Sequence, residues 1–148
     1  MKIFDCFTFY NELDLLQIRL EELYDVVNHF VLVEATTTFT NRPKEMLFKA
    51  NQDRYSKYLN KIIHVEIELP GSSNAWDNER AQRNAILQGT ATAGPNDIII
   101  VSDCDEIPRP FFTYTPGTFT VCNKVSETIA NLDIEFFITY AQDGEAYN

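Results

Sequence analysis

The sequence predicts an α/β fold in which helices flank a mostly parallel β-sheet. Short apolar runs typical of buried strands alternate with helical segments about every 30 residues, which is the rhythm of βαβ units. The chain has 148 residues, about the size of one domain. Hydrophobic residues make up 45% of it, which is enough to form a core and argues against disorder.

Four segments have the pattern of strands that belong to one sheet. Residues 3–9 and 62–69 alternate between apolar and polar side chains, whereas residues 30–33 and 98–101 are continuous apolar runs. Further along, residues 111–121 are a hairpin candidate and residues 134–140 another strand candidate.

Helices are expected between these strands. From residue 13 to 27, apolar residues recur at spacings of three and four, and the helix is expected to end near Asn28. Its expected solvent-facing residues are Arg19, Glu21 and Glu22. Residues 51–60 predict a short helix and residues 77–88 a longer one, with Asp77 or Asn78 as its N-cap. Residues 36–43 and 70–73 are expected to be loops.

Charge and cysteine content exclude several classes of function. The formal net charge of −10 argues against non-specific nucleic-acid binding and against anionic membrane surfaces. A phosphorylated small ligand stays compatible with this charge, because local arginines or a metal ion can reverse the local field. The cysteines are Cys6, Cys104 and Cys122, without the spacing of a zinc knuckle or a disulfide framework. Cys6 and Cys104 are expected to be buried thiols.

The sequence enters a strand at once, and we find neither a signal peptide nor an apolar stretch long enough to span a bilayer. From this pattern we expect a cytoplasmic, reducing compartment.

The most informative motif is Asp103-Cys104-Asp105-Glu106, directly after the apolar run at residues 98–101. In open α/β sheets, ligands bind at the carboxyl ends of the strands. Converging carboxylates repel one another, and a hard divalent cation such as Mg²⁺ or Mn²⁺ would offset that repulsion. The alternative is a solvated acidic turn that ends at Pro108.

A second candidate set lies on the helix expected after residue 76. Helical spacing puts Trp76, Arg80, Arg83 and Asn84 on one face, where the two arginines could clamp phosphate oxygens. The alternative is a surface helix carrying an ordinary Glu79–Arg83 ion pair.

Other polar residues are ambiguous. Glu34 ends an apolar strand and could serve a ligand hydroxyl, cap a helix or brace a loop. Asn11 and Glu12 follow the first strand with the same ambiguity. His29 and His64 have no partner at ligand spacing and are expected to be structural.

Together, these motifs resemble glycosyltransferase family 17, the group of β-1,4-mannosyl-glycoprotein N-acetylglucosaminyltransferases. Segments of the sequence carry the resemblance, in the family's order: residues 3–16 (IFDCFTFYNELDLL), 30–35 (FVLVEA) with 38–40 (TFT), 76–86 (WDNERAQRNAI) and 99–110 (IIVSDCDEIPRP). The presence of these segments in this order is more specific evidence for the resemblance than any one segment alone.

The resemblance implies a GT-A fold, which is Rossmann-like, together with a UDP-sugar donor such as UDP-GlcNAc and a divalent metal, Mn²⁺ or Mg²⁺. Asp103 and Asp105 match the family's Asp-x-Asp motif, so Asp105 is expected to bind the metal and Asp103 to assist it or to bind the ribose. Expected donor contacts also include Arg80, Arg83, Glu34 and Trp76. The residues expected to support these metal and donor contacts are Glu106, Glu79 and Asn84.

The resemblance divides the chain into a donor-binding portion, residues 1–110, and the start of an irregular or divergent acceptor-side portion, residues 111–148. We find little family pattern beyond Pro110, and the sequence identifies no general base. The late acidic residues lie in no recognisable motif: Asp133, Glu135, Asp143 and Glu145. A truncated chain is therefore expected. Animal relatives of this family are anchored in the Golgi, so a bacterial or viral setting is expected for a chain without an anchor.

The functional hypothesis is an inverting transfer of a sugar, GlcNAc by resemblance, to a glycan hydroxyl. One alternative is a non-catalytic remnant that binds UDP-sugar without transferring it. Another is a haloacid-dehalogenase-like phosphotransferase, which also uses Asp-x-Asp after a buried strand. That class expects Thr or Val soon after the second aspartate, whereas Glu106-Ile107-Pro108 follows here.

Overall fold

The structure is a computed structural model that describes residues 1–108 and 137–140. Its centre is one five-stranded sheet in the order β3-β2-β1-β4-β5. The strands are β1 (Ile3–Phe9), β2 (His29–Ala35), β3 (Ile62–Ile67), β4 (Ile98–Val101) and β5 (Phe137–Tyr140). The first four strands run parallel, and β5 pairs antiparallel with β4. The prediction of an α/β fold with a mostly parallel sheet is therefore confirmed.

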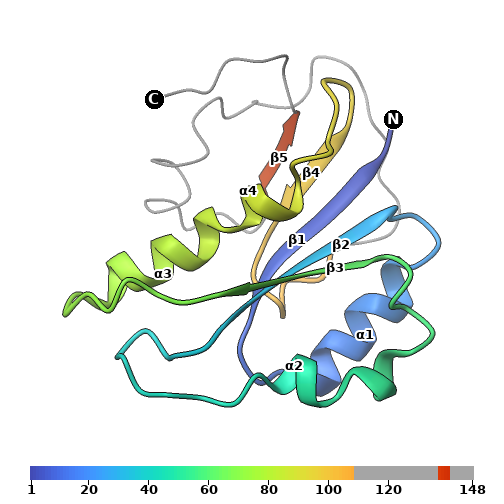
Figure 1. Cartoon of the computed structure of the whole chain (residues 1–148). Helices are drawn as coiled ribbons and strands as arrows, with labels where there is room; N and C mark the ends of the chain where they lie inside the picture. The colour runs from blue at the N-terminus through green and yellow to red at the C-terminus, as the bar shows by residue number, and fades with distance from the viewer. Residues whose placement is uncertain (109–136, 141–148) are drawn as a thin grey trace.

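Helices cover both faces of the sheet (Figure 1). On one face lie α1 (Leu13–Leu23), α2 (Leu47–Ala50) and a short 3₁₀ helix (Gln52–Tyr55). On the other face lie α3 (Ala75–Asn84) and α4 (Ile86–Gly89).

Helix boundaries differ from the sequence-based expectation in three places. The first helix ends at Leu23 rather than near Asn28. The expected helix at 51–60 is replaced by two shorter helices, α2, which begins earlier, and the 3₁₀ helix, which ends at Tyr55. The N-cap of α3 is Asn74, whose side-chain oxygen accepts a hydrogen bond from the Trp76 amide at 3.2 Å. Neither Asp77 nor Asn78 caps this helix.

Alternation along the strands divides the buried side chains into two layers. Phe7 and Phe9 of β1 pack in the cluster shared with α1 and α2, whereas Phe4 and Cys6 belong to the cluster shared with α4. Both Cys6 and Cys104 are buried free thiols, as predicted, and Cys122 lies outside the described residues. The tight approach of α4 to β2 requires a glycine: a Cβ on Gly89 would lie 2.2 Å from Val31 Cγ1.

One expectation about the first helix is wrong. Arg19 was expected to face solvent, but its side chain is fully buried. Asp5 shares the sheet face of Phe7 and Phe9, directly under α1, and is fully buried as well. The two charges neutralise each other inside the protein, which explains why α1 can bury an arginine.

The order of the strands fixes where a ligand can approach. From β1 the chain adds β2 and β3 on one side and then crosses to place β4 on the other side of β1. The direction of sheet growth therefore reverses between β1 and β4, and ligands of open α/β sheets bind beside such a point, at the carboxyl ends of the strands.

Several expectations fall on residues that the structure does not describe. These are the hairpin at 111–121, the first residues of the strand at 134–140 and the late carboxylates Asp133, Glu135, Asp143 and Glu145; β5 itself forms at 137–140. In the described ranges, none of the helices has both the length and the apolar character needed to cross a membrane.

Candidate functional site

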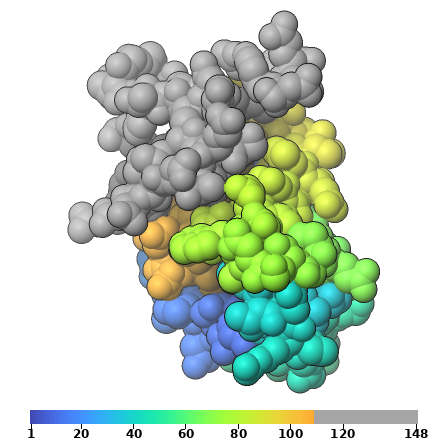
Figure 2. Space-filling model, turned by 90° about the vertical axis from the view of Figure 1, so that its left-hand side faces the viewer, coloured from blue at the N-terminus to red at the C-terminus, as the bar shows by residue number. Residues whose placement is uncertain are grey.

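A pocket of about 620 Å³ lies at the carboxyl ends of β1, β2 and β4, within the size range of ligand sites. It is lined from four parts of the chain: Thr8, Phe9, Tyr10 and Glu12; Thr37, Thr38, Phe39, Thr40, Arg42 and Lys44; Glu79, Gln82 and Arg83; and Asp103, Cys104 and Asp105. Figure 2 shows this face, with the start of α3 in lime green above the cyan segment after β2 and the orange residues after β4 beside them.

The segment after β4, residues 102–106, is here called the acidic loop. It is held from below by Arg19, whose Nη1 donates to the carbonyl oxygens of Asp103 (2.6 Å), Cys104 (3.2 Å) and Glu106 (3.2 Å). Arg19 Nη2 also donates to Ser102 Oγ at 2.6 Å. Arg19 therefore fixes the loop through three backbone carbonyl oxygens and the Ser102 hydroxyl, and it makes no hydrogen bond to the side chains of Asp103 and Asp105.

Arg19 is itself held in a fixed orientation by Asp5. Its Nε donates to Asp5 Oδ2 at 2.8 Å and its Nη2 to Asp5 Oδ1 at 2.7 Å, which is the bidentate geometry that favours arginine over lysine. Burial lowers the pKa of Arg19, but the charge and hydrogen bonds of Asp5 raise it by more, so the guanidinium stays charged.

Glu106 closes the acidic loop from above. Its Oε2 accepts a hydrogen bond from the Asp103 amide at 3.0 Å, and the Ser102 hydroxyl donates to the Glu106 carbonyl at 3.1 Å. Glu106 thus shapes the backbone that carries Asp103, and it does not line the pocket. This position agrees with a supporting residue behind the predicted ligands.

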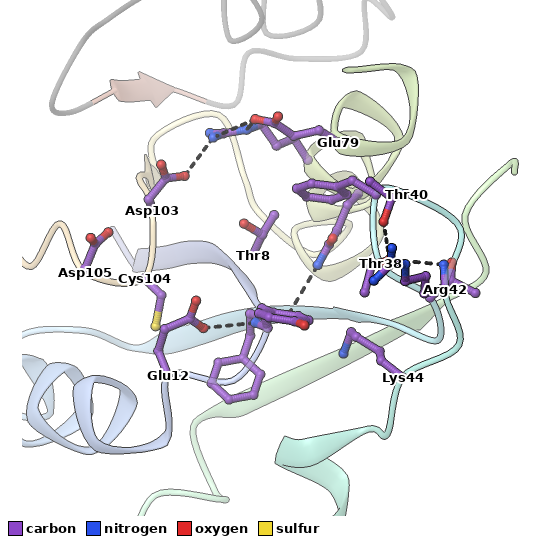
Figure 3. A pocket seen from close by; sticks show the side chains of 16 residues that line it. Thr8, Glu12, Thr38, Thr40, Arg42, Lys44, Glu79, Asp103, Cys104 and Asp105 are labelled. Carbon is purple, nitrogen blue, oxygen red and sulfur yellow. Dashed lines mark hydrogen bonds and ion pairs between the residues drawn. The ribbon is translucent and has the colours of Figure 1, made fainter. Parts of the chain in front are cut away.

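Asp103 faces helix α3 across the pocket wall. Its Oδ1 accepts a hydrogen bond from Arg83 Nη2 at 2.7 Å, and the same Nη2 lies 3.2 Å from Glu79 Oε1 (Figure 3). Arg83 is therefore shared between a carboxylate on its own helix and one on the acidic loop.

Asp105 lies at the open rim of the same pocket, beside Cys104 (Figure 3). Among the described residues, its carboxylate makes neither a hydrogen bond nor an ion pair with another side chain. Within residues 1–108 and 137–140 there is no cluster of three or more metal-binding side chains. An all-protein metal cage is therefore not formed here, whereas one or two carboxylates that share a cation with phosphate oxygens fit the chemistry of Mg²⁺ and Mn²⁺.

Cys104 separates the two aspartates and turns the other way, into the core. Burial, opposed by Arg19 and assisted by nearby carboxylates, raises the pKa of its thiol to about 12. It is a neutral packing residue between two solvent-facing acids, which is why Asp103 and Asp105 point to the same side of the loop.

The opposite end of the pocket is basic. Lys44 Nζ lies 5.5 Å from the centroid of the Tyr10 ring and 3.8 Å from Glu34 Oε1. Burial lowers the pKa of Lys44, and the charges of Glu34 and Glu12 oppose that shift. Arg42 lines the same end (Figure 3). The pocket therefore has an acidic pole at the loop after β4 and a basic pole at the loop after β2.

Two buried amides of α3 hold the walls together. Asn78 Nδ2 donates to the carbonyl oxygens of Phe39 (2.8 Å) and Ser72 (2.9 Å), and so joins the loop after β2 to the loop before α3. Gln82 Nε2 donates to the Val33 carbonyl at 2.9 Å, at the end of β2. These contacts attach α3, which carries Glu79 and Arg83, to the sheet.

The structure separates the residues predicted to bind the metal or the donor and those predicted to support them. Asp103, Asp105, Arg83 and Glu79 lie together in the pocket, whereas Trp76, Arg80 and Asn84 do not line it. Trp76 is 71% exposed, Arg80 pairs with Asp77 at 2.5 Å, and Asn84 lines a separate shallow hollow beside β3.

Glu34 does not line the pocket either, although its Oε1 lies 3.8 Å from Nζ of the pocket residue Lys44. Strand alternation places it on the α2 face, where Oε1 accepts a hydrogen bond from the Phe48 amide at 3.0 Å and Oε2 lies 3.1 Å from His64 Nε2. Glu34 thus satisfies an amide in the first turn of α2, in agreement with the helix-capping alternative. His64 packs against it, and Phe4 packs against His29, in agreement with structural roles for both histidines.

Sequence analysis left Glu12 ambiguous and did not select Arg42, Lys44 or Gln82, all of which line the pocket. A usable signal was present for the first three. They follow β1 or β2, and segments that follow parallel strands gather at the same edge of a sheet as the segment after β4. Gln82 gave no such signal, because a polar residue on a helix is usually solvent-exposed.

Known proteins resemble this chain over much of its length. The sequence model described as glycosyltransferase family 17 matches residues 1–139, which extends beyond the last recognisable motif at Pro110. The chain is 29% identical over 107 residues to the human protein named β-1,4-mannosyl-glycoprotein 4-β-N-acetylglucosaminyltransferase, covering 66% of this chain and 20% of the relative. The rat protein of the same name matches equally well, and the mouse protein is 28% identical over the same length and coverage.

The chain spans about a fifth of the length of these curated relatives. No solved structure matches it. The family model covers nearly the whole sequence, and Asp103 and Asp105 lie in one pocket of a Rossmann-like fold. The chain belongs to glycosyltransferase family 17.

Proposed function

We propose that this chain forms the donor site of a metal-dependent, inverting glycosyltransferase that moves N-acetylglucosamine from UDP-GlcNAc to a glycan hydroxyl. The observation that supports this best is the convergence of Asp103, Asp105 and Arg83 on one pocket at the carboxyl ends of the strands. Membership of the family supports glycosyl transfer and argues against the phosphotransferase alternative. The names of the curated relatives suggest the transferred sugar.

The proposed roles follow from the charges. Asp105, assisted by Asp103, would hold the divalent cation, Mn²⁺ or Mg²⁺, which when bound supplies positive charge to the diphosphate leaving group. Arg83 would donate hydrogen bonds to the diphosphate oxygens from the α3 side, where it would stabilise the negative charge that develops as the bond between the sugar's anomeric carbon and the diphosphate oxygen breaks. Inversion also requires a carboxylate that removes the proton of the acceptor hydroxyl.

Other residues of the chain position these groups. Arg19 and Glu106 fix the acidic loop, and Gln82 ties α3 to the end of β2. Tyr10 and Lys44 at the basic pole line the same pocket as the acidic loop, and a UDP moiety would extend between the two poles.

Calorimetric titration of UDP and UDP-GlcNAc, with Mn²⁺ and with EDTA, tests the donor site. We expect binding that requires Mn²⁺ and is lost in Asp105→Ala, while circular dichroism shows an unchanged fold because the acidic loop is held through its backbone. Asp14→Ala is the matched control, since this 89% exposed aspartate lies outside the pocket.

The two outcomes separate the alternatives. UDP affinity that is the same in Asp105→Ala and in the parent protein rules out the proposed donor site. Metal-dependent binding without release of UDP in the presence of a glycan acceptor selects the alternative of a donor-binding protein that does not transfer sugar.

A further inference from the structure

We propose that Arg83 acts as an internal counter-cation, which occupies Asp103 until a diphosphate arrives and thereby makes the divalent cation and the nucleotide bind cooperatively. This coupling rests on the proposed function, because it requires both a cation and a diphosphate at this pocket. It adds a specific role for Arg83: the residue opposes binding of the cation alone and favours binding of the two ligands together.

The first observation is that Arg83 competes for the same carboxylate that a cation would use. Its Nη2 lies 2.7 Å from Asp103 Oδ1, which is a charge-assisted hydrogen bond. The Arg83 side chain is 22% exposed and Asp103 is 47% exposed, so the pair is accessible from the pocket. A bare cation that approaches Asp103 therefore meets a positive charge already in place.

The second observation is that Arg83 has another carboxylate within reach. Glu79 Oε1 lies 3.2 Å from Arg83 Nη2 and accepts a hydrogen bond from Arg83 Nε at the same distance. Arg83 can leave Asp103 and keep a partner on its own helix, because Glu79 sits one turn before it. The guanidinium is therefore not committed to Asp103 alone.

The third observation is that only side chains need to move. The acidic loop is fixed by Arg19 through three carbonyl oxygens, and α3 is fixed by Asn78 and Gln82. A rotation of the Arg83 side chain, from Asp103 to a phosphate oxygen, is enough to free the carboxylate. Arginine suits this exchange, since its planar fork binds carboxylates and phosphates with the same geometry.

These contacts predict cooperative binding. A diphosphate gives Arg83 a new acceptor, which releases Asp103 for the cation, and the cation in turn attracts the diphosphate. By linkage, each ligand then raises the affinity of the other by the same factor. Cation alone binds weakly, because it must displace Arg83 without giving it a replacement acceptor.

The test measures Mn²⁺ binding by calorimetry without UDP and with saturating UDP, and UDP binding with saturating Mn²⁺. In Arg83→Gln we expect Mn²⁺ alone to bind about three- to fivefold more tightly, the size of a partly exposed ion pair. UDP with Mn²⁺ should bind about tenfold more weakly, because a charged hydrogen-bond donor to the diphosphate is lost.

Two further variants make the result specific. Glu79→Gln leaves Arg83 with Asp103 as its carboxylate partner in the pocket wall, so Mn²⁺ alone should bind more weakly, opposite in sign to Arg83→Gln. Arg54→Gln removes the same charge from an exposed pair with Asp14, outside the pocket, and should leave both affinities within twofold of the parent.

The outcomes are distinguishable. Opposite changes in the two affinities of Arg83→Gln support the coupling, and a mutant that merely loses structure would weaken both. Mn²⁺ affinity that is unchanged or reduced in Arg83→Gln overturns the coupling, while the parent protein's binding of UDP with Mn²⁺ still stands. If the parent protein binds no UDP with Mn²⁺, the proposed donor site itself fails, and the coupling fails with it.

Discussion

Arg19 and Asp5 form a bidentate ion pair in which both side chains are completely buried, between α1 and β1. The same guanidinium donates to three carbonyl oxygens of the acidic loop. One buried residue thus connects the first strand, the first helix and the loop that carries Asp103 and Asp105.

Arg19→Met should lower the free energy of unfolding by about 3–5 kcal/mol, because it leaves the Asp5 charge and the loop carbonyl oxygens buried without a partner. Urea denaturation followed by circular dichroism measures this. Arg54→Met, which breaks an exposed pair, should cost about 1 kcal/mol or less. The double variant Asp5→Leu/Arg19→Met should recover part of the loss. If Arg19→Met and Arg54→Met lowered the free energy of unfolding by similar amounts, the structural role of Arg19 would be contradicted.

Asn78→Asp should loosen the wall of the pocket, since it keeps the shape of the side chain but removes the amide donor. The amide bonds to the carbonyl oxygens of Phe39 and Ser72 are lost, at a cost of about 1–3 kcal/mol. Hydrogen exchange at residues 36–43 should become faster than in the parent protein. Asn60→Asp, whose exposed side chain makes one long bond to Tyr24, is the control and should leave this exchange unchanged.

The stability of the protein should fall at alkaline pH, in part through Cys104. Burial raises the pKa of this thiol to about 12, above the ordinary value of 9.0 that it regains on unfolding. The folded state therefore favours the protonated thiol. The contribution of this thiol to the free energy of unfolding is complete below about pH 9 and is lost as pH rises toward 12. Denaturation between pH 8 and pH 10.5 should show a decline that is shallower in Cys104→Ala, by at most about 1.4 kcal/mol per pH unit. Parallel declines in the two proteins would refute this contribution.

Gly89→Ala should destabilise the protein by about 1–3 kcal/mol through overpacking against β2. The added Cβ would lie 2.2 Å from Val31 Cγ1, and both α4 and β2 are held by the core. Gly94→Ala is the matched control, because its Cβ meets only Asp97 Oδ2 at 3.7 Å. Thermal denaturation should separate the two variants, and Val31→Ala should cost less in the Gly89→Ala background than alone. Equal melting temperatures for the two glycine variants would be the contrary result.

The strands and the position of the acidic loop could be predicted because they depend on local pattern. Continuous apolar runs indicate strands buried on both faces, and parallel strands end at a common edge. Asp103 and Asp105 follow such a run, so their place at the ligand edge was predictable before any contact was known.

The burial of Arg19 was missed because its charge was given more weight than its position. Arg19 lies between Leu16 and Leu20 at helical spacing, on the apolar face of α1. Asp5 lies in a strand that is otherwise apolar or aromatic on that side. A charged residue on each of two facing surfaces is a signal for a buried pair, but only when both are considered together.

The pocket-facing side of α3 was misjudged for a related reason. Asn78 and Gln82 are polar yet buried, because their amides satisfy backbone groups of other segments. The amphipathic pattern cannot reveal such residues, so the face with Trp76, Arg80, Arg83 and Asn84 was favoured, although only Arg83 of these four lines the pocket. Which carbonyl oxygens need a donor is a tertiary property that local sequence does not contain.

The support that Arg19 gives to the acidic loop has a consequence for how this family can diversify. Carbonyl oxygens are common to every amino acid, so a loop recognised through them keeps its path when its side chains change. Asp103 and Asp105 can therefore be substituted during evolution while the backbone of the acidic loop keeps its position. The charge of the pocket can thus change at these two positions at little cost to the stability of the fold.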